Sequence, residues 1–238
     1  MINSRPRTVF FSALSLAALV AISGCASATE PAESSAPPVA QPSVTPTPEP
    51  TRQALADLVV TPDGLDYLAI GAPVPAEDEA TAIAEYNPTY CTDVVGGDRE
   101  PGTPGAGAWV SIYGEGDEQG FSIKTEELAE DGDITSITLF SDDIGTAEGI
   151  HQGATEEELL AAYPEFDDVV ETGFTKIYVI DGDAGKLLFE VAVDSEEQPT
   201  YWDSEPEKVG TVLWLRVVTP DEEFLSIAAT DTAGPCPV

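Results

Sequence analysis

The chain begins with a segment that has the features of a leader removed from the mature protein, and this limits which residues form the folded part. Arg5 and Arg7 precede an apolar run of small and aliphatic residues at 9–22, and Cys25 follows shortly after it. A positive start, a short apolar run and small residues before a cleavage point are typical of a secretory signal peptide. The run is shorter than the roughly 20 residues that a membrane-spanning helix needs. We therefore expect residues 1–24 to be a signal peptide and not a permanent membrane span.

The residues Ile22, Ser23, Gly24 and Cys25 resemble the lipobox of bacterial lipoproteins. The resemblance implies cleavage after Gly24 and a diacylglyceryl group on the thiol of Cys25, which becomes the first residue of the mature protein. Two acyl chains are enough for stable membrane attachment. The resemblance thus implies a protein anchored by lipid to the extracytoplasmic face of the cell membrane. The alternative is an ordinary signal peptide whose cleavage site lies near a cysteine.

Residues 25–52 are predicted to form a disordered linker. The segment is rich in Pro, Ser, Thr and Ala, and residues 26–51 contain neither an aromatic nor a basic side chain. Such a segment buries too little apolar surface to offset its ordering entropy. In a polyproline II conformation, at about 3.1 Å per residue, it would separate a domain from the membrane by several tens of Å. This layout resembles that of actinobacterial envelope lipoproteins.

The charge balance argues against a nucleic-acid partner. The whole chain has 44 acidic and 9 basic residues and a formal charge of −35. Removal of the leader takes away Arg5 and Arg7 but no acid, so the mature charge becomes −37. Nucleic-acid binding needs a basic face to neutralise phosphates. We interpret the excess of acid as a source of solubility; cation binding or a basic partner is the alternative.

Three cysteines are present, and Cys25 is assigned to lipidation. Cys91 and Cys236 remain as a pair, and outside the cytoplasm such a pair tends to form a disulfide. The bridge would close a loop of about 145 residues, which is worth roughly 4–5 kcal/mol in the chain-entropy model. The alternative is two buried free thiols. The chain has no C-x-x-C motif, so neither a thioredoxin-like nor a zinc site is expected.

A weak internal repeat suggests two copies of one unit. "TPDGLDYLAIGAPVP" begins at Thr61 and "TAEGIHQGATEEELLAAYP" begins at Thr146. In the second stretch Thr155 and Glu158 have the spacing of a capping box, which predicts a helix that Pro164 ends. A similar but weaker helix is expected over residues 77–86. We therefore predict a first repeat over residues 53–143 and a second over 144–238.

Runs with alternating apolar and β-branched residues follow each expected helix, and they predict strands. The "DGDAGK" stretch at 181–186 has the composition of a hairpin turn between two of them. The six runs are residues 108–114, 120–125, 134–141, 174–181, 186–194 and 211–219.

These elements predict an α+β fold in which short helices of two tandem copies pack on an antiparallel sheet. The element order, and the pattern of Gly, Thr, Glu-Leu and Tyr over residues 149–163, distantly resemble the β-lactamase inhibitor protein and the BamE-like envelope lipoproteins. The resemblance covers residues 58–219. It implies a function in binding protein partners and no enzymatic activity, and it matches no partner-contact motif.

The sequence lacks the motifs of common catalytic sites. It contains no G-x-S-x-G or S-x-x-K nucleophile motif, no H-E-x-x-H zinc motif and no phosphate-binding glycine loop. His151 is the single histidine, and we interpret it as a turn or surface residue. D-G-D stretches at 131–133 and 181–183 offer the oxygen ligands that Ca²⁺ prefers, but neither continues into an EF-hand loop. We predict no catalytic residue, no metal ligand and no cofactor.

The mildest indication of a binding surface is the pair Tyr201 and Trp202, which lies in a polar stretch. Exposed Tyr and Trp are enriched at protein interfaces, although the pair could instead fill the edge of the core. We predict a lipid-anchored binding protein with an envelope protein partner. The alternatives are an envelope hydrolase that uses a carboxylate pair and a lipoprotein that binds a cation or small ligand.

Overall fold

Alternating apolar and β-branched residues place most of the folded chain in β-strands. The computed structural model describes residues 51–77, 80–96, 100–101, 103, 105–114, 119–194, 196, 199–222, 226–228 and 234–236. In this part of the chain, twelve strands form two sheets. The other regular elements there are the helices α1 (Tyr90–Val95) and α2 (Glu156–Ala162) and three short 3₁₀ turns, at Leu55–Asp57, Glu126–Leu128 and Pro206–Lys208.

The larger sheet has eight strands, and every neighbouring pair is antiparallel. It contains all six strands expected from the sequence, together with two edge strands that the sequence did not reveal. In spatial order the strands are β4 (Ala84–Asn87), β5 (Ala108–Ser111), β6 (Phe121–Thr125), β7 (Ile134–Leu139), β12 (Val212–Val218), β11 (Lys186–Ala192), β10 (Thr175–Asp181) and β9 (Asp168–Glu171).

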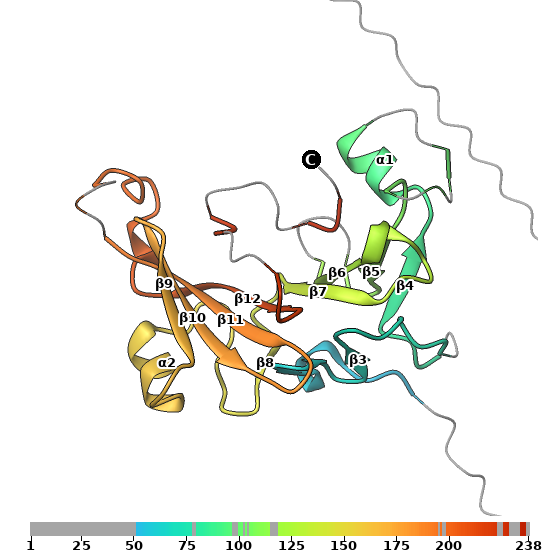
Figure 1. The fold of residues 1–238 in the computed structure, drawn as a ribbon. Coiled ribbons are helices and arrows are strands. Elements are labelled where there is room, and N and C mark those ends of the chain that lie inside the picture. Colours follow the sequence, from blue (N-terminus) through green and yellow to red (C-terminus); the bar gives the residue numbers. More distant parts are fainter. Residues whose placement is uncertain are drawn as a thin grey trace, which may run out of the picture. The chain divides into compact units, whose positions relative to one another are not determined.

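The large sheet consists of two four-stranded halves. β4 to β7 follow one another along the chain, and so do β9 to β12, with a tight turn between β10 and β11 in which Gly182 N–H donates to Gly185 O at 2.8 Å. The halves meet where β7 pairs with β12, with Leu139 opposite Leu215. Residues 48–238 form one compact unit. β4 to β7, from residues 53–143, and β9 to β12, from residues 144–238, are therefore parts of a single sheet (Figure 1).

The smaller sheet brings the two repeated stretches together. It contains β3 (Leu68–Ala69), β2 (Gly64–Leu65), β1 (Val59–Thr61) and β8 (Gly145–Thr146) in that order, and β1 pairs with β8 in parallel. The two repeated stretches share a glycine, Gly64 in the first and Gly149 in the second, and each turn requires it for a different reason. At Gly64 a Cβ atom would lie 1.9 Å from the carbonyl oxygen of Leu68, whereas Gly149 has a φ of 88°, which favours glycine.

The main core lies between the lower face of the large sheet, as drawn in Figure 1, and the layer formed by the small sheet and α2. Burial of large apolar side chains from all three elements stabilises this arrangement by about 1.5–3 kcal/mol each. Examples are Leu65 and Leu68 from the small sheet, Leu159 from α2, and Phe121 and Phe189 from the large sheet.

Helix α2 begins as the sequence predicts. Thr155 is the N-cap: its hydroxyl accepts a hydrogen bond from Glu158 N–H at 3.2 Å, and Glu158 Oε2 accepts one from Thr155 N–H at 2.8 Å. The capping box is therefore confirmed. The turn before this helix is also as expected, since His151 is exposed.

The predicted α+β class, with short helices covering a sheet in each copy, is wrong. The described chain is mainly β, and the layer against the large sheet is mostly another sheet. The helix expected over residues 77–86 does not form: Ala84–Asn87 is strand β4, with Tyr86 opposite Trp109. Pro88 disfavours helical backbone at the residue before it. In addition, the backbone groups at the edge of β5 need hydrogen-bond partners, and β4 supplies them.

The upper face of the large sheet carries smaller apolar groups and buried polar side chains. Ile177, Val179, Leu188 and Val218 form one apolar group. Beside them lies Glu190, which contacts the C-terminal segment at residues 226–228. In the described part of the chain, no helix is long and apolar enough to cross a membrane.

Candidate functional site

Two adjoining cavities, of about 530 and 510 Å³, share Gln152 and Trp214 as a common wall. We call them together the aromatic groove. Each volume lies in the range of known ligand sites. The aromatic residues lining the groove are Tyr90, Phe140, Tyr201, Trp202 and Trp214.

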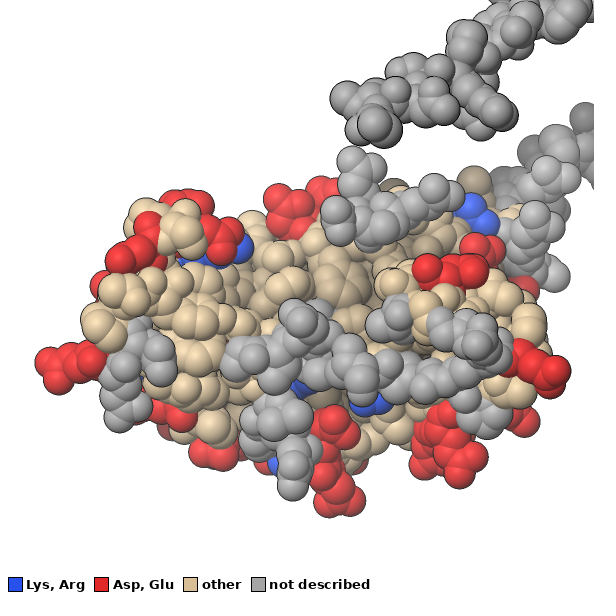
Figure 2. Space-filling view, turned by 90° about the horizontal axis from the view of Figure 1, so that it is seen from above, with Lys and Arg blue, Asp and Glu red and all other residues tan. Residues whose placement is uncertain are grey.

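The groove lies towards the upper face of the large sheet. Its lining includes Ala228 and Pro235 from the C-terminal segment and Trp214 from β12. Figure 2 shows this face from above, with acidic side chains gathered at its rim.

Trp202 is fixed by its neighbours and not freely exposed. Its side chain is only 8% exposed and packs with Ala192 and Leu213. Its indole N–H donates to the carbonyl oxygen of Phe174 at 3.0 Å. Trp202 therefore fills the edge of the core, as the alternative interpretation of this pair expects. It also lines the groove.

Tyr201 is the exposed member of the pair, with 40% of its surface accessible. Its ring stacks on Phe174 with a centroid separation of 4.1 Å and an interplanar angle of 16°. Its hydroxyl donates to the carbonyl oxygen of Ala228. These two contacts orient the ring, so little side-chain entropy remains to be lost when a ligand packs against it.

Trp214 and Phe140 form the centre of the groove, and sequence reasoning missed both. They come from β12 and from the residue after β7, and their rings meet edge to face with centroids 5.9 Å apart. Their runs, "TVLWLRVVT" and "ITSITLFS", are apolar on both strand faces near these positions. Alternation therefore gave no signal that these two rings face a cavity.

Polar groups lie along the groove. At one end, Lys208 Nζ and Glu205 Oε1 are 2.6 Å apart, and both side chains are partly exposed. At the other end, Gln119 is buried and its Oε1 accepts a hydrogen bond from the Tyr90 hydroxyl at 3.2 Å. Rigid rings with a few polar groups between them favour binding by packing and hydrogen bonding.

The predicted disulfide between Cys91 and Cys236 is present and lies next to the groove. The structure places the two sulfur atoms 2.20 Å apart and the two Cα atoms 5.2 Å apart. Tyr90 and Pro235, the chain neighbours of these cysteines, both line the groove. The link thus joins two parts of the groove wall. Cys25, the predicted lipidation site, lies outside the described residues, as do the signal peptide and the linker as far as residue 50.

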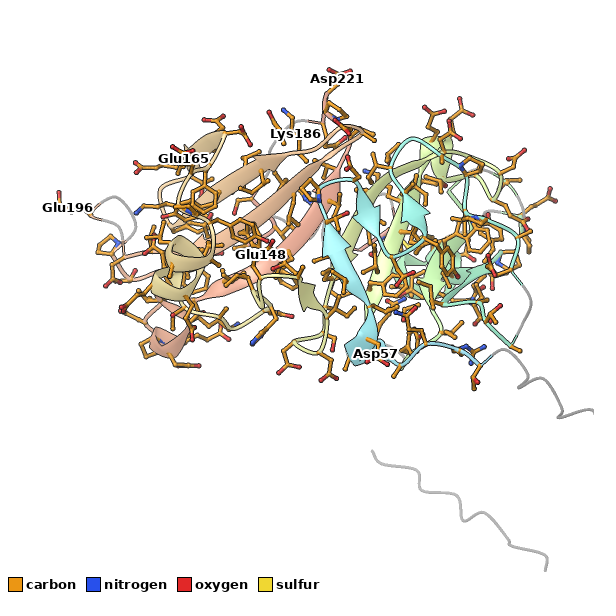
Figure 3. The ribbon with its side chains drawn as sticks, turned by 90° about the horizontal axis from the view of Figure 1, so that it is seen from below. Asp57, Glu148, Glu165, Lys186, Glu196 and Asp221 are labelled. Carbon is orange, nitrogen blue, oxygen red and sulfur yellow. A yellow bond between two sulfur atoms is a disulfide. The ribbon has the colours of Figure 1, made fainter. Side chains whose placement is uncertain are left out.

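A separate cavity of about 400 Å³ is lined by Glu148, His151 and Glu158, and it bears on the hydrolase alternative. A hydrogen bond from the Tyr163 hydroxyl at 2.6 Å lowers the pKa of Glu148. Hydrogen bonds from Thr155 likewise lower the pKa of Glu158. A carboxyl group that donates a proton to a leaving group needs a raised pKa, so these two do not suit that role. Figure 3 shows Glu148 between α2 and the small sheet.

The two D-G-D stretches do not converge on other ligands. The second of them forms the turn between β10 and β11, where Asp181 Oδ1 lies 3.9 Å from Lys186 Nζ. Among the described residues, no three His, Cys, Asp or Glu side chains come together in a way that could bind a metal ion.

Comparison with known proteins assigns no family or function to the chain. No family model, no curated protein sequence and no solved structure matches the chain.

Proposed function

We propose that the protein is a lipid-anchored extracytoplasmic binding protein that engages an envelope protein partner through the aromatic groove. The groove is the observation that carries this proposal. Aromatic side chains dominate the energetics of protein interfaces, especially where they lie in pockets that exclude water. Here Tyr201, Trp202 and Trp214 are already oriented by neighbouring side chains, which lowers the entropic cost of binding.

The partner would contribute a segment with apolar side chains and a few polar groups. Gln152 offers an amide in the middle of the groove, and the Lys208–Glu205 pair offers both a cation and a carboxylate at one end. The acidic surroundings disfavour a strongly acidic segment, because like charges repel. A neutral or mildly basic segment therefore fits the groove best.

Lipid attachment at Cys25 is the first testable part of the proposal. Protein purified from its native membrane is expected to begin at Cys25 and to carry a diacylglyceryl group, and it should partition into the detergent phase. The Cys25→Ser variant should move to the aqueous phase, because it has no acyl chain to insert. Intact mass spectrometry and detergent-phase partitioning measure both. A native protein with unmodified Cys25 would contradict the lipoprotein assignment.

The groove is tested by capture from detergent-solubilised envelope, with the mature chain in its Cys25→Ser form as bait. A specific partner should be retained, and free bait should compete it off. Tyr201→Ala and Trp214→Leu are expected to weaken binding at least ~10-fold, the usual effect of removing an interface anchor. Titration of the identified partner by calorimetry gives the magnitude.

The matched control is Leu160→Ala. Leu160 is 47% exposed on α2, on the opposite side of the large sheet. This substitution removes exposed apolar surface outside the groove, so the affinity for the partner should stay unchanged. Equal affinity for all three variants, each checked for an unaltered melting temperature, would exclude the groove as the binding site.

A further inference from the structure

Another cavity, of about 800 Å³, lies beside β4 and β5 at the other end of the large sheet. We call it the β4 cavity. Its walls come from Tyr86 on β4, Thr103, Trp109 on β5, the segment at residues 73–76 and the loop at residues 127–131. None of these residues lines the aromatic groove, so its ligand would be bound independently of the proposed partner.

Two aromatic rings form one corner of the β4 cavity. Tyr86 and Trp109 are opposite each other on β4 and β5, and their ring centroids are 5.7 Å apart at an interplanar angle of 59°. The faces of aromatic rings carry partial negative charge and attract cations within about 6 Å. Two tilted rings can therefore contact a single cation from two sides.

The ionisable groups around the corner add negative charge. Besides Tyr86, the ionisable residues lining the cavity in the described chain are Glu127, Glu130 and Asp131. All three carboxylates are exposed at the rim and so remain hydrated. Burial raises the pKa of Tyr86, and the charge of Glu130 raises it further, which is consistent with a negative potential at the corner.

The rim is fixed in position. The indole N–H of Trp109 donates to the carbonyl oxygen of Glu130 at 2.9 Å, and this ties the ring to the acidic loop. Within the loop, the Thr125 hydroxyl donates to Ala129 O at 2.6 Å and Glu126 N–H donates to Asp133 O at 2.8 Å. The rings and carboxylates therefore need little rearrangement on binding.

We propose that the β4 cavity binds a quaternary ammonium group. A metal ion would need several carboxylates converging on one point, and the described residues form no such cluster. A primary ammonium is strongly hydrated and seeks hydrogen-bond acceptors, whereas a quaternary ammonium has no N–H donor and is recognised by aromatic faces with negative charge nearby. The Tyr86–Trp109 corner and its acidic rim match the second type of cation.

The test uses choline and its neutral analogue 3,3-dimethylbutan-1-ol, in which a carbon atom replaces the nitrogen. Calorimetric titration of the mature Cys25→Ser chain at constant ionic strength is expected to show binding of choline. The neutral analogue should bind at least ~10-fold more weakly, because shape and apolar area are the same and only the charge is lost. Equal binding of the two compounds, or no choline binding, overturns the proposal.

Variants locate the site. Tyr86→Leu and Glu130→Gln are expected to weaken choline binding by about 3- to 30-fold, the range of one cation–π contact or one nearby charge. Trp109 packs against the main core, so its replacement would mix binding with folding and is not used. Glu157→Gln on α2 makes the same charge change elsewhere and should have no effect. Loss of choline binding in Tyr201→Ala but not in Tyr86→Leu would assign the cation to the aromatic groove instead and overturn the proposal.

Discussion

Replacement of Glu190 by alanine is expected to lower the free energy of unfolding by about 3–5 kcal/mol, the usual cost of removing one partner from a buried charged network. Glu190 is 4% exposed on the upper face of the large sheet. Its carboxylate accepts hydrogen bonds from the Thr175 hydroxyl at 3.0 Å, from Ile227 N–H at 2.8 Å, and from the Ser226 hydroxyl. The alanine variant leaves these buried donors without their acceptor.

Arg216 adds to the expected loss. It lies on β12, next to β11, and is nearly buried. Burial lowers the pKa of Arg216, while the negative charges of Glu190 and Glu222 act in the opposite direction. Removal of Glu190 takes away one of these two charges and so raises the cost of keeping the guanidinium ionised inside the protein.

Chemical unfolding of wild type and variant measures the effect. Glu171→Ala removes an acid from the exposed edge strand β9 and should change the unfolding free energy by less than about 0.5 kcal/mol. Because Glu190 also accepts from Ala228 N–H at 3.4 Å and Ala228 lines the aromatic groove, Glu190→Ala should also weaken partner binding. A stability change below about 1 kcal/mol would show that the C-terminal segment does not depend on this carboxylate.

Removal of the disulfide is expected to have a comparable effect. The bond links positions 145 residues apart, and the chain-entropy model assigns a loop of that length about 4–5 kcal/mol of stabilisation. The variant carrying both Cys91→Ser and Cys236→Ser should therefore unfold at clearly lower denaturant concentration than the oxidised wild type.

Reducing agent provides the internal control. It should lower the stability of the wild type towards that of the double serine variant and leave the variant itself unchanged. Thiol titration under denaturing conditions should find no free thiol in the Cys25→Ser chain. Two titratable thiols, together with no effect of reducing agent, would contradict a structural disulfide.

The sequence predicted individual elements better than their assembly. Runs such as residues 174–181 and 186–194 alternate over enough residues to identify strands, and the Thr155–Glu158 spacing located α2 correctly. The small sheet was missed because β2, β3 and β8 have two residues each, too few for any periodicity to show. Their pairing depends on tertiary contacts. For the same reason, part of the segment at residues 77–86 pairs with the edge of β5 as a strand, although its local pattern is helical.

The groove was predicted only in part. Tyr201 and Trp202 stood out because they are aromatic residues in a polar stretch. Phe140 follows Leu139, and Trp214 stands between Leu213 and Leu215, so the immediate neighbours do not distinguish a ring that lines a cavity from one that fills the core. The β4 cavity combines residues from five separate segments, and only the fold brings them together.

The pairing of β7 with β12 places the last strand of the described residues in the middle of the large sheet. During synthesis or export, β7 and β11 both remain open edges until Val212–Val218 is available, and open edges can pair with other chains. Local pairing can complete each half early, whereas the junction must wait for a contact between distant segments, which is slow to form. A chain interrupted before residue 212 therefore exposes two unpaired edges at the centre of its largest sheet, and we expect such fragments to aggregate or be degraded, not to accumulate as a partly active protein.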